Sequence, residues 1–166
     1  MAYMATSFIE SSLAAADWHP CGASHVAVYG TLRAGGVNEM ARLSPGRAIT
    51  GRAMLTGTLY DMGWYPGLRL RGSQQVLAEV YPLDNALEQV LDRYEGVWPH
   101  STGEYTKRIV TTAVALTGGG TQTMAVLVYE ALAAAVAQAR VIQASDWLAW
   151  FHAPQSHCAA EIARSA

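Results

Sequence analysis

The sequence contains little cysteine, little charge and no long uninterrupted apolar run. Its two cysteines, Cys21 and Cys158, lie near opposite ends without a CxxC pair, so we expect reduced thiols rather than a disulfide framework. Charged residues make up 14% of the chain and its net charge is −2, which argues against nucleic acid or an anionic membrane as a partner. No run of about 18 uncharged apolar residues is present, so we expect no membrane span.

We do not expect the start of the chain to be a secretory signal peptide, because it lacks a basic n-region and because Glu10 interrupts its apolar stretch. We therefore expect a cytoplasmic protein. Residues 1–23 are rich in Ala and Ser and are interpreted as an N-terminal extension, either disordered or a short helix capped by Ser7. Residues 24–152 are expected to form one domain, followed by a C-terminal tail at 153–166.

A globular core is expected, since 51% of the residues are hydrophobic, and the 15 glycines suggest many turns. Apolar or alternating segments indicate strands at residues 25–29, 52–62, 68–71, 75–83, 104–116 and 121–132. A bulge is expected at Gly57 and a turn at Gly72 and Ser73. Strands and helices do not alternate regularly, which argues against a doubly wound parallel sheet. We predict an α+β fold: a small, mixed but mostly antiparallel β-barrel of about six strands, flanked by one main helix and short helices.

Segment 84–96 is the clearest helix prediction. Asp84 is placed as an N-cap, and Gly96 lies where a C′ glycine is expected. Four apolar residues recur at helical spacing on one face: Leu87, Val90, Leu91 and Tyr94. Shorter helical turns are predicted at 37–43 and 145–151.

Glu95 is the first candidate for acid–base chemistry. It lies in the last turn of the predicted helix, next to Tyr94 and at the edge of the buried face. The negative end of the helix dipole and partial burial both favour the protonated carboxyl and raise its pKa. A general acid or base needs a pKa near the working pH, so this placement suits catalysis. The alternative interpretation is a solvent-exposed glutamate at a fraying helix end.

Glu79 is the main rival to Glu95. Within its apolar strand it is a site candidate if it faces inward and an ordinary residue if it faces outward. Asp61 and Glu104 lie at strand ends and rank lower. Histidines and cysteines gather near the two ends of the chain: His19, Cys21, His152, His157 and Cys158. We interpret them as tail residues and expect no metal and no cofactor.

The segment Tyr-Gly-Thr-Leu-Arg, residues 29–33, directly follows a predicted buried strand. Gly30 allows a tight turn there, and free N–H groups after a strand form a concavity for a carboxylate or a phosphate. A plain strand-to-loop turn is the alternative, and the GxxxxGK[ST] pattern of a P-loop is absent. Position alone assigns a catalytic role to none of the tyrosines in or beside the strands: Tyr29, Tyr60, Tyr65, Tyr81, Tyr105 and Tyr129.

Several of these segments occur in an order that resembles the γ-glutamyl cyclotransferase-like superfamily, which includes AIG2-like proteins and γ-glutamylamine cyclotransferases. VAVYGTLR (26–33) resembles its first-strand signature, and LDRYEG (91–96) resembles the helix end that carries its catalytic glutamate. Further segments resemble its other landmarks: LYDMGWYPGL (59–68), AEVYPL (78–83), EYTKRIV (104–110) and MAVLVYEA (124–131). Each motif is weak alone, but their order is specific.

The resemblance implies an enzyme that closes a γ-glutamyl amide to 5-oxoproline and releases its amine. It implies Glu95 as the general acid/base, and demotes Glu79 to a supporting role. The substrate-binding residues that it implies are Tyr29, Gly30, Thr31, Leu32, Gly67, Tyr105 and Tyr129. Among these, the backbone N–H groups of 30–32 would hold the substrate carboxylate, and Gly67 would let the backbone approach the substrate.

A monomer or weak homodimer acting on a small γ-glutamyl substrate is therefore expected. The segment 95–108 carries a somewhat long insert, which leaves the identity of the released amine open. The alternative is a non-catalytic AIG2-like module that binds a small molecule, because a fold does not determine a function.

Overall fold

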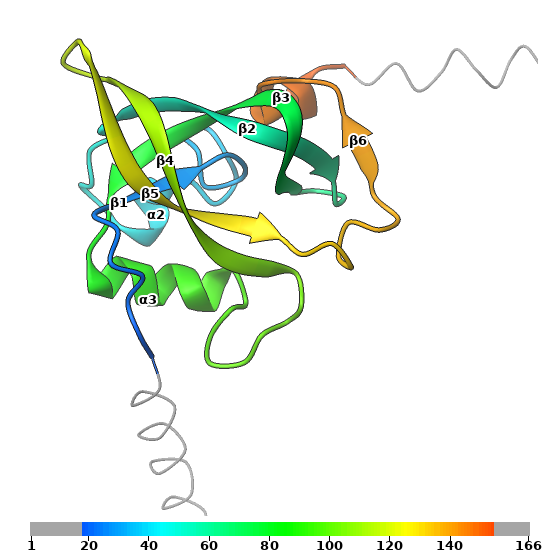
Figure 1. Ribbon diagram of the computed structural model, residues 1–166, viewed down its shortest axis with the longest axis horizontal. Helices are drawn as coiled ribbons and strands as arrows, with labels where there is room; N and C mark the ends of the chain where they lie inside the picture. The colour runs from blue at the N-terminus through cyan, green and yellow to red at the C-terminus, as the bar shows by residue number, and fades with distance from the viewer. Residues whose placement is uncertain (1–17, 155–166) are drawn as a thin grey trace, which may run out of the picture.

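The computed structural model describes residues 18–154, in which strands wrap into a barrel and helices lie on its outside (Figure 1). The strands are β1 (His25–Val28), β2 (Gly51–Asp61), β3 (Pro66–Pro82), β4 (Tyr105–Leu116), β5 (Thr121–Ala131) and β6 (Arg140–Ile142). The helices are α2 (Met40–Leu43), α3 (Asn85–Tyr94) and α4 (Trp147–His152). The short helix expected after Ser7 lies outside the described residues.

Five strands close the barrel in the order β3-β1-β5-β4-β2, because β2 also pairs with β3. The β1–β5 pairing is parallel and the other pairings are antiparallel. β6 is added beside the far end of β2, where Leu59 pairs with Ile142. The sequence pattern does not predict β6, since three residues carry too little periodicity. The predicted α+β class and the mixed, mostly antiparallel barrel are confirmed.

β3 is one long strand, whereas the sequence suggested two strands separated by a turn at Gly72 and Ser73. Its pairing with β2 shifts register at the predicted bulge, where Gly57 pairs with Gln74 and Thr58 with Arg69. Gly72 has a φ of 106° at this irregularity, a conformation that glycine adopts without strain. The glycine therefore marks a break in register within a strand and not the end of one.

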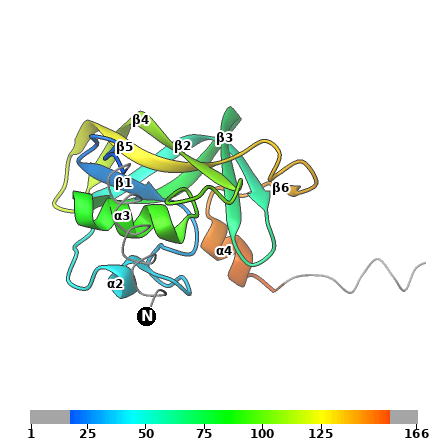
Figure 2. The ribbon, with the colours of Figure 1, turned by 90° about the horizontal axis from the view of Figure 1, so that it is seen from below.

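α3 has the predicted ends but a different buried face. Asp84 Oδ1 accepts a hydrogen bond from the Leu87 N–H at 2.8 Å, as expected of an N-cap. The buried residues are Leu87, Glu88, Leu91 and Asp92, whereas Val90 and Tyr94 are each 38% exposed. The predicted apolar stripe is therefore wrong at two of its four positions. Figures 1 and 2 show α3 lying along the outside of the barrel beside β1. Two of the residues that α3 buries are acidic, Glu88 and Asp92.

The barrel interior is filled by apolar side chains from its long strands, among them Leu55, Leu59, Val76 and Val126. Trp147 of α4 joins this cluster. A second cluster joins the barrel to α3 through residues such as Leu87 and Leu91. α4 overlaps the helical turn predicted at 145–151, and Asp146 Oδ1 caps its start by accepting from the Ala149 N–H at 3.1 Å. No helix within residues 18–154 is both long enough and apolar enough to cross a bilayer.

Candidate active site

A partly open cavity of about 240 Å³ lies where several distant segments meet. Its lining consists of residues 27–32, residues 64–66, Tyr94, Glu95, Glu104, Tyr105 and Tyr129. The structure thus brings Glu95 together with all the expected substrate-binding residues except Gly67. Neither a lysine, an arginine nor a histidine lines the cavity among the residues described, so its charge comes from carboxylates.

Glu95 is half-buried and directly follows the last residue of α3. Its backbone N–H donates to Leu91 O at 2.8 Å, and Gly96 then turns the chain with a φ of 65°. No group in residues 18–154 donates a hydrogen bond to the Glu95 carboxylate. Burial raises the pKa of Glu95 to about 8, and the negative charge of Glu104 adds to this rise. A carboxyl with such a pKa can both accept and donate a proton near neutral pH.

The loop after β1 has three consecutive backbone donors among the residues that line the cavity. Gly30, Thr31 and Leu32 line the cavity, and their N–H groups have no acceptor within the described part of the chain. A turn in which the Arg33 N–H donates to Gly30 O at 3.1 Å holds the loop in shape. A Cβ at Gly30 would lie 2.7 Å from Pro66 Cγ, so a side chain there would displace the opposite wall. The loop can therefore hold an anionic group through its backbone.

The three tyrosines implied by the resemblance line the cavity, and their hydroxyls already have hydrogen-bonding partners within the protein. Tyr29 donates to Tyr129 O at 2.7 Å and accepts from the Leu68 N–H at 3.2 Å. Tyr105 donates to Pro66 O at 2.7 Å, and Tyr129 donates to an aspartate on α3. Burial is the main reason that the pKa of Tyr29 is raised, and the negative charge of Glu95 adds to it. The Tyr29 phenol therefore stays protonated. These residues shape the cavity, and Glu95 and Glu104 are the two carboxyl groups in its lining.

Gly67 does not line the cavity. A Cβ there would lie 2.5 Å from Met62 Sδ and 2.9 Å from the Ala131 Cβ. The structure therefore explains this glycine by close packing behind the wall and not by an approach of the backbone to a ligand.

Sequence reasoning ranked Glu104 low and assigned no site role to Trp64 or Tyr94, yet all three line the cavity. Tyr65 OH donates to Glu104 Oε1 at 2.9 Å, and the Tyr65 ring makes an edge contact with Trp64, their centroids 4.9 Å apart. Trp64 is 57% exposed at the rim. The aromatic pair in the Trp-Tyr-Pro-Gly turn was the available signal, because Tyr and Trp combine an apolar ring with a polar group and are enriched at interfaces.

Glu79 points away from the barrel interior, which its neighbours Ala78 and Val80 help to fill, and it lies outside the cavity in a buried network. Its Oε2 accepts from the Ala34 N–H at 2.8 Å and from Tyr81 OH at 2.9 Å, and its Oε1 lies 3.6 Å from Arg33 Nε. Arg33 also donates to Asp146 Oδ1 at 2.7 Å. With its charge compensated in this way, Glu79 stabilises the fold and connects the loop after β1 to α4.

Residues 18–154 contain no group of three or more His, Cys, Asp or Glu side chains arranged to hold a metal. His157 and Cys158, considered above as part of such a group, lie outside the described residues.

The sequence model of the family described as "Gamma-glutamyl cyclotransferase, AIG2-like" matches residues 26–149. The chain belongs to this AIG2-like family. An AIG2-like protein from Mus musculus is similar in structure, with 25% identity, a TM-score of 0.51, and coverage of 65% of this chain and 76% of the other. No curated protein matches the chain.

Two bacterial structures share the AIG2-like fold. A protein specific to uropathogenic Escherichia coli is 20% identical, with a TM-score of 0.53 and coverage of 76% of this chain and 94% of the other. YkqA from Bacillus subtilis is 24% identical, with a TM-score of 0.53 and coverage of 75% and 39% respectively. Membership of the AIG2-like family supports a cyclotransferase-type enzyme in general and names neither the substrate nor the catalytic residue of this chain.

Proposed function

We propose that the protein is a γ-glutamyl cyclotransferase that converts a γ-glutamyl amide into 5-oxoproline and a free amine, with Glu95 as the general acid/base. The observation that carries the proposal is the pairing of two features in one cavity. One is a carboxyl that has no hydrogen-bonding partner within residues 18–154 and a pKa raised to about 8. The other is the row of three N–H groups at 30–32, for which the described part of the chain supplies no acceptor.

Substrate binding would begin with the α-carboxylate on the backbone N–H groups of Gly30, Thr31 and Leu32. These donors are fixed in place before the substrate arrives, so little order is lost on binding. With the carboxylate held there and the tyrosine rings forming the walls, the substrate folds so that its α-nitrogen approaches its own γ-carbonyl. Both reacting groups belong to one molecule, and the cavity needs mainly to hold them in this near-attack shape.

Proton transfer would then pass through Glu95. Its carboxylate takes a proton from the α-ammonium, and the free amine attacks the γ-carbonyl carbon to form the new ring C–N bond. The bond to the leaving nitrogen breaks as Glu95 donates a proton to it, because an amide nitrogen leaves poorly as an anion. Overall the α-nitrogen loses two protons and the departing nitrogen gains two to leave as an ammonium, so Glu95 ends in its starting state.

The charge of the cavity bears on the leaving amine. Glu95 and Glu104 line the cavity without a balancing cation from the described residues, and Trp64 lies exposed at its rim. A carboxylate on the leaving group would be repelled, whereas an ammonium could interact with Glu104 and with an aromatic face. We therefore expect the γ-glutamyl amide of 1,4-diaminobutane to be a better substrate than that of n-butylamine, which differs only by the terminal ammonium.

The decisive experiment is detection of 5-oxoproline by mass spectrometry after incubation with a panel of γ-glutamyl amides, including that matched pair. Wild type should release 5-oxoproline, and Glu95→Gln should reduce the rate by at least about 100-fold while still binding substrate. Glu39→Gln, a substitution of the same type outside the cavity, is the control. If Glu95→Gln turns over at the wild-type rate, the assignment of Glu95 is wrong. Binding without release by wild type would favour a small-molecule-binding module.

A further inference from the structure

Behind the cavity wall, α3 turns two buried acids toward the barrel: Glu88 and Asp92, each 1% exposed. Lys107 of β4 bridges them, with its Nζ 2.7 Å from Glu88 Oε1 and 2.8 Å from Asp92 Oδ2. We call these three residues the α3 network. Burial alone would lower the pKa of Lys107, but its hydrogen bonds to Asp92 and Glu88 hold that pKa above its usual value.

We propose that the α3 network is a positioning device that holds the Glu95 end of α3 against the wall of the cavity, and that the N-terminal segment 18–21 completes it. The proposal rests on the proposed function for its effect on turnover. The residues of the network touch no substrate in this scheme, so they act through Glu95 and Tyr129.

Asp92 joins the network to the cavity through its side chain and its backbone. Its Oδ1 accepts the hydroxyl of Tyr129 at 2.7 Å, and Tyr129 lines the cavity. Its carbonyl oxygen accepts from the Val97 N–H at 2.9 Å and from the Trp98 N–H at 3.1 Å. Those two bonds span Glu95, which lies between Asp92 and Val97 in the chain. One residue thus holds both the cavity wall and the turn that carries the proposed acid/base.

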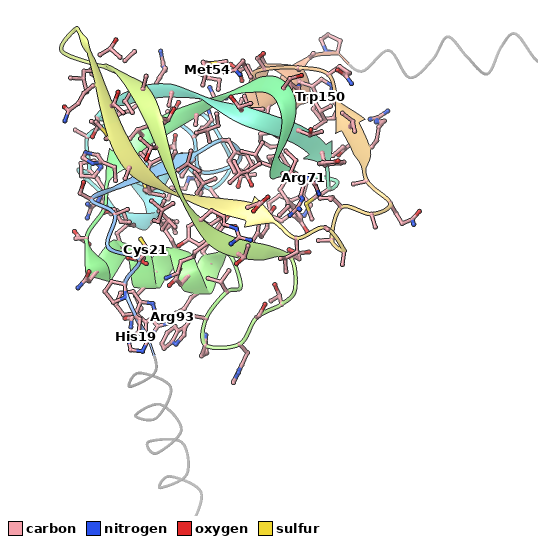
Figure 3. The ribbon with its side chains drawn as sticks, viewed as in Figure 1. His19, Cys21, Met54, Arg71, Arg93 and Trp150 are labelled. Atoms are coloured by element: carbon pink, nitrogen blue, oxygen red, sulfur yellow. The ribbon has the colours of Figure 1, made fainter. Side chains whose placement is uncertain are left out.

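The network has one positive charge for two buried carboxylates, so it needs neutral donors as well. Trp18 Nε1 donates to Asp92 Oδ2 at 2.7 Å, and the Cys21 backbone N–H donates to Glu88 Oε1 at 2.7 Å. Figure 3 shows Cys21 lying against α3. A buried carboxylate that loses a hydrogen-bond donor is no longer compensated for its removal from water, which is energetically costly. Removal of either donor should therefore destabilise the network.

Stability alone does not account for this arrangement. Well-packed apolar residues in place of a buried ion pair are often neutral or stabilising, and an apolar helix face would suffice to pack α3 on the barrel. Directed hydrogen bonds add a defined orientation, which a proton-transfer group needs because small misplacements of reacting groups are costly to the rate. Two of the donors come from residues 18–21, which precede the region shared with the family at 26–149. This chain therefore supports its site with residues outside that shared region.

The first test compares turnover in the full-length chain. Trp18→Phe keeps a ring but removes the donor, and Lys107→Met removes the bridging cation. Each should lower kcat by about tenfold or more while KM changes by less than about threefold. Lys107→Arg can still bridge two carboxylates and should restore most of the loss. Trp150→Phe on α4 is the matched control, with kcat unchanged. Rates are measured well below each variant's melting temperature, so that loss of folded protein does not contribute.

The second test is independent of activity and uses amide hydrogen exchange followed by NMR. The Val97 and Trp98 amides should exchange about tenfold faster or more in Trp18→Phe and Lys107→Met. The Trp150 amide, which donates to Asp146 O at 3.0 Å in α4, should not change. If wild type releases no 5-oxoproline from any amide, the proposed function fails and exchange alone decides the positioning role. Unchanged exchange at Val97 and Trp98, or unchanged kcat in an active enzyme with only a lower melting temperature, overturns the proposal.

Discussion

Glu95 and Glu104 are two carboxylates of one cavity, and the charge of Glu104 adds to burial in raising the pKa of Glu95 to about 8. They come from the end of α3 and from the residue before β4, at the two ends of the loop that joins these elements. Burial is the larger cause, and the second carboxylate makes ionisation of Glu95 still less favourable. This relationship makes the rate of the proposed reaction depend on pH in a predictable direction.

The rate of 5-oxoproline release should rise with pH toward about 8, because Glu95 must be ionised to accept the first proton. Glu104→Gln removes the negative neighbour, so the pKa of Glu95 should fall and the rising limb of kcat/KM should move to lower pH. The apparent pKa of this limb should still lie above the ordinary range for glutamate, because Glu95 remains buried in the variant. A pH–rate profile of wild type and Glu104→Gln checks this, and identical limbs would contradict the coupling.

Glu95→Gln should stabilise the fold at neutral and alkaline pH. In the folded protein Glu95 keeps its proton up to about pH 8, whereas the ordinary pKa of a glutamate in an unfolded chain is about 4.5. Unfolding therefore releases a proton between these values, and the free energy of unfolding falls as pH rises through this window. Because Glu95 is only partly buried, we expect a moderate effect: Glu95→Gln should raise the free energy of unfolding by about 1–3 kcal/mol at pH 8 and by little at pH 4. Urea unfolding at both pH values measures the gain, and an equal effect at both would refute the linkage.

Gly30→Ala should damage the substrate site. The added Cβ would lie 2.7 Å from Pro66 Cγ and 2.8 Å from Pro66 Cδ, so either the N–H loop or the opposite wall must shift. We expect KM to rise by about tenfold or more and stability to fall by about 1–3 kcal/mol. Gly118→Ala is the matched control, because a Cβ there meets nothing within 4 Å. Comparable KM values for the two variants would show that the loop geometry does not matter for binding.

Glu79→Gln should affect stability and leave turnover intact. Arg33 is 5% exposed and Glu79 is 2% exposed, so the loss of one charge leaves the other buried without full compensation. We expect a loss of about 3 kcal/mol in the free energy of unfolding, with kcat and KM near wild type. Asp61→Asn breaks the exposed pair with Arg140 and should cost less than about 1 kcal/mol. A large fall in kcat in folded Glu79→Gln would mean that Glu79 serves the reaction.

Local features of the sequence predicted much of this fold. The ends of α3 follow from Asp84 and Gly96, because a capping hydrogen bond and a left-handed φ are encoded within a few residues. The same reasoning anticipated the bulge at Gly57 and the candidate acid Glu95. The continuity of β3 and the existence of β6 could not be anticipated, because both depend on pairing with β2.

The features of the cavity also fall into two groups: those that the sequence predicted and those that only the structure revealed. Glu95 at a helix end and the glycine turn at 30–32 are properties of short segments, and they could be proposed from the residues alone. That Glu104 and Glu95 line the same cavity, and that α3 buries Glu88 and exposes Val90, became clear only from the structure. Lys107 and Trp18 supply the ion pair and the hydrogen bond that compensate the buried acidic side chains of α3. Both residues come from parts of the chain that are distant in sequence from α3. Local backbone preferences act over a few residues, whereas burial and the proximity of charges are decided when the barrel closes.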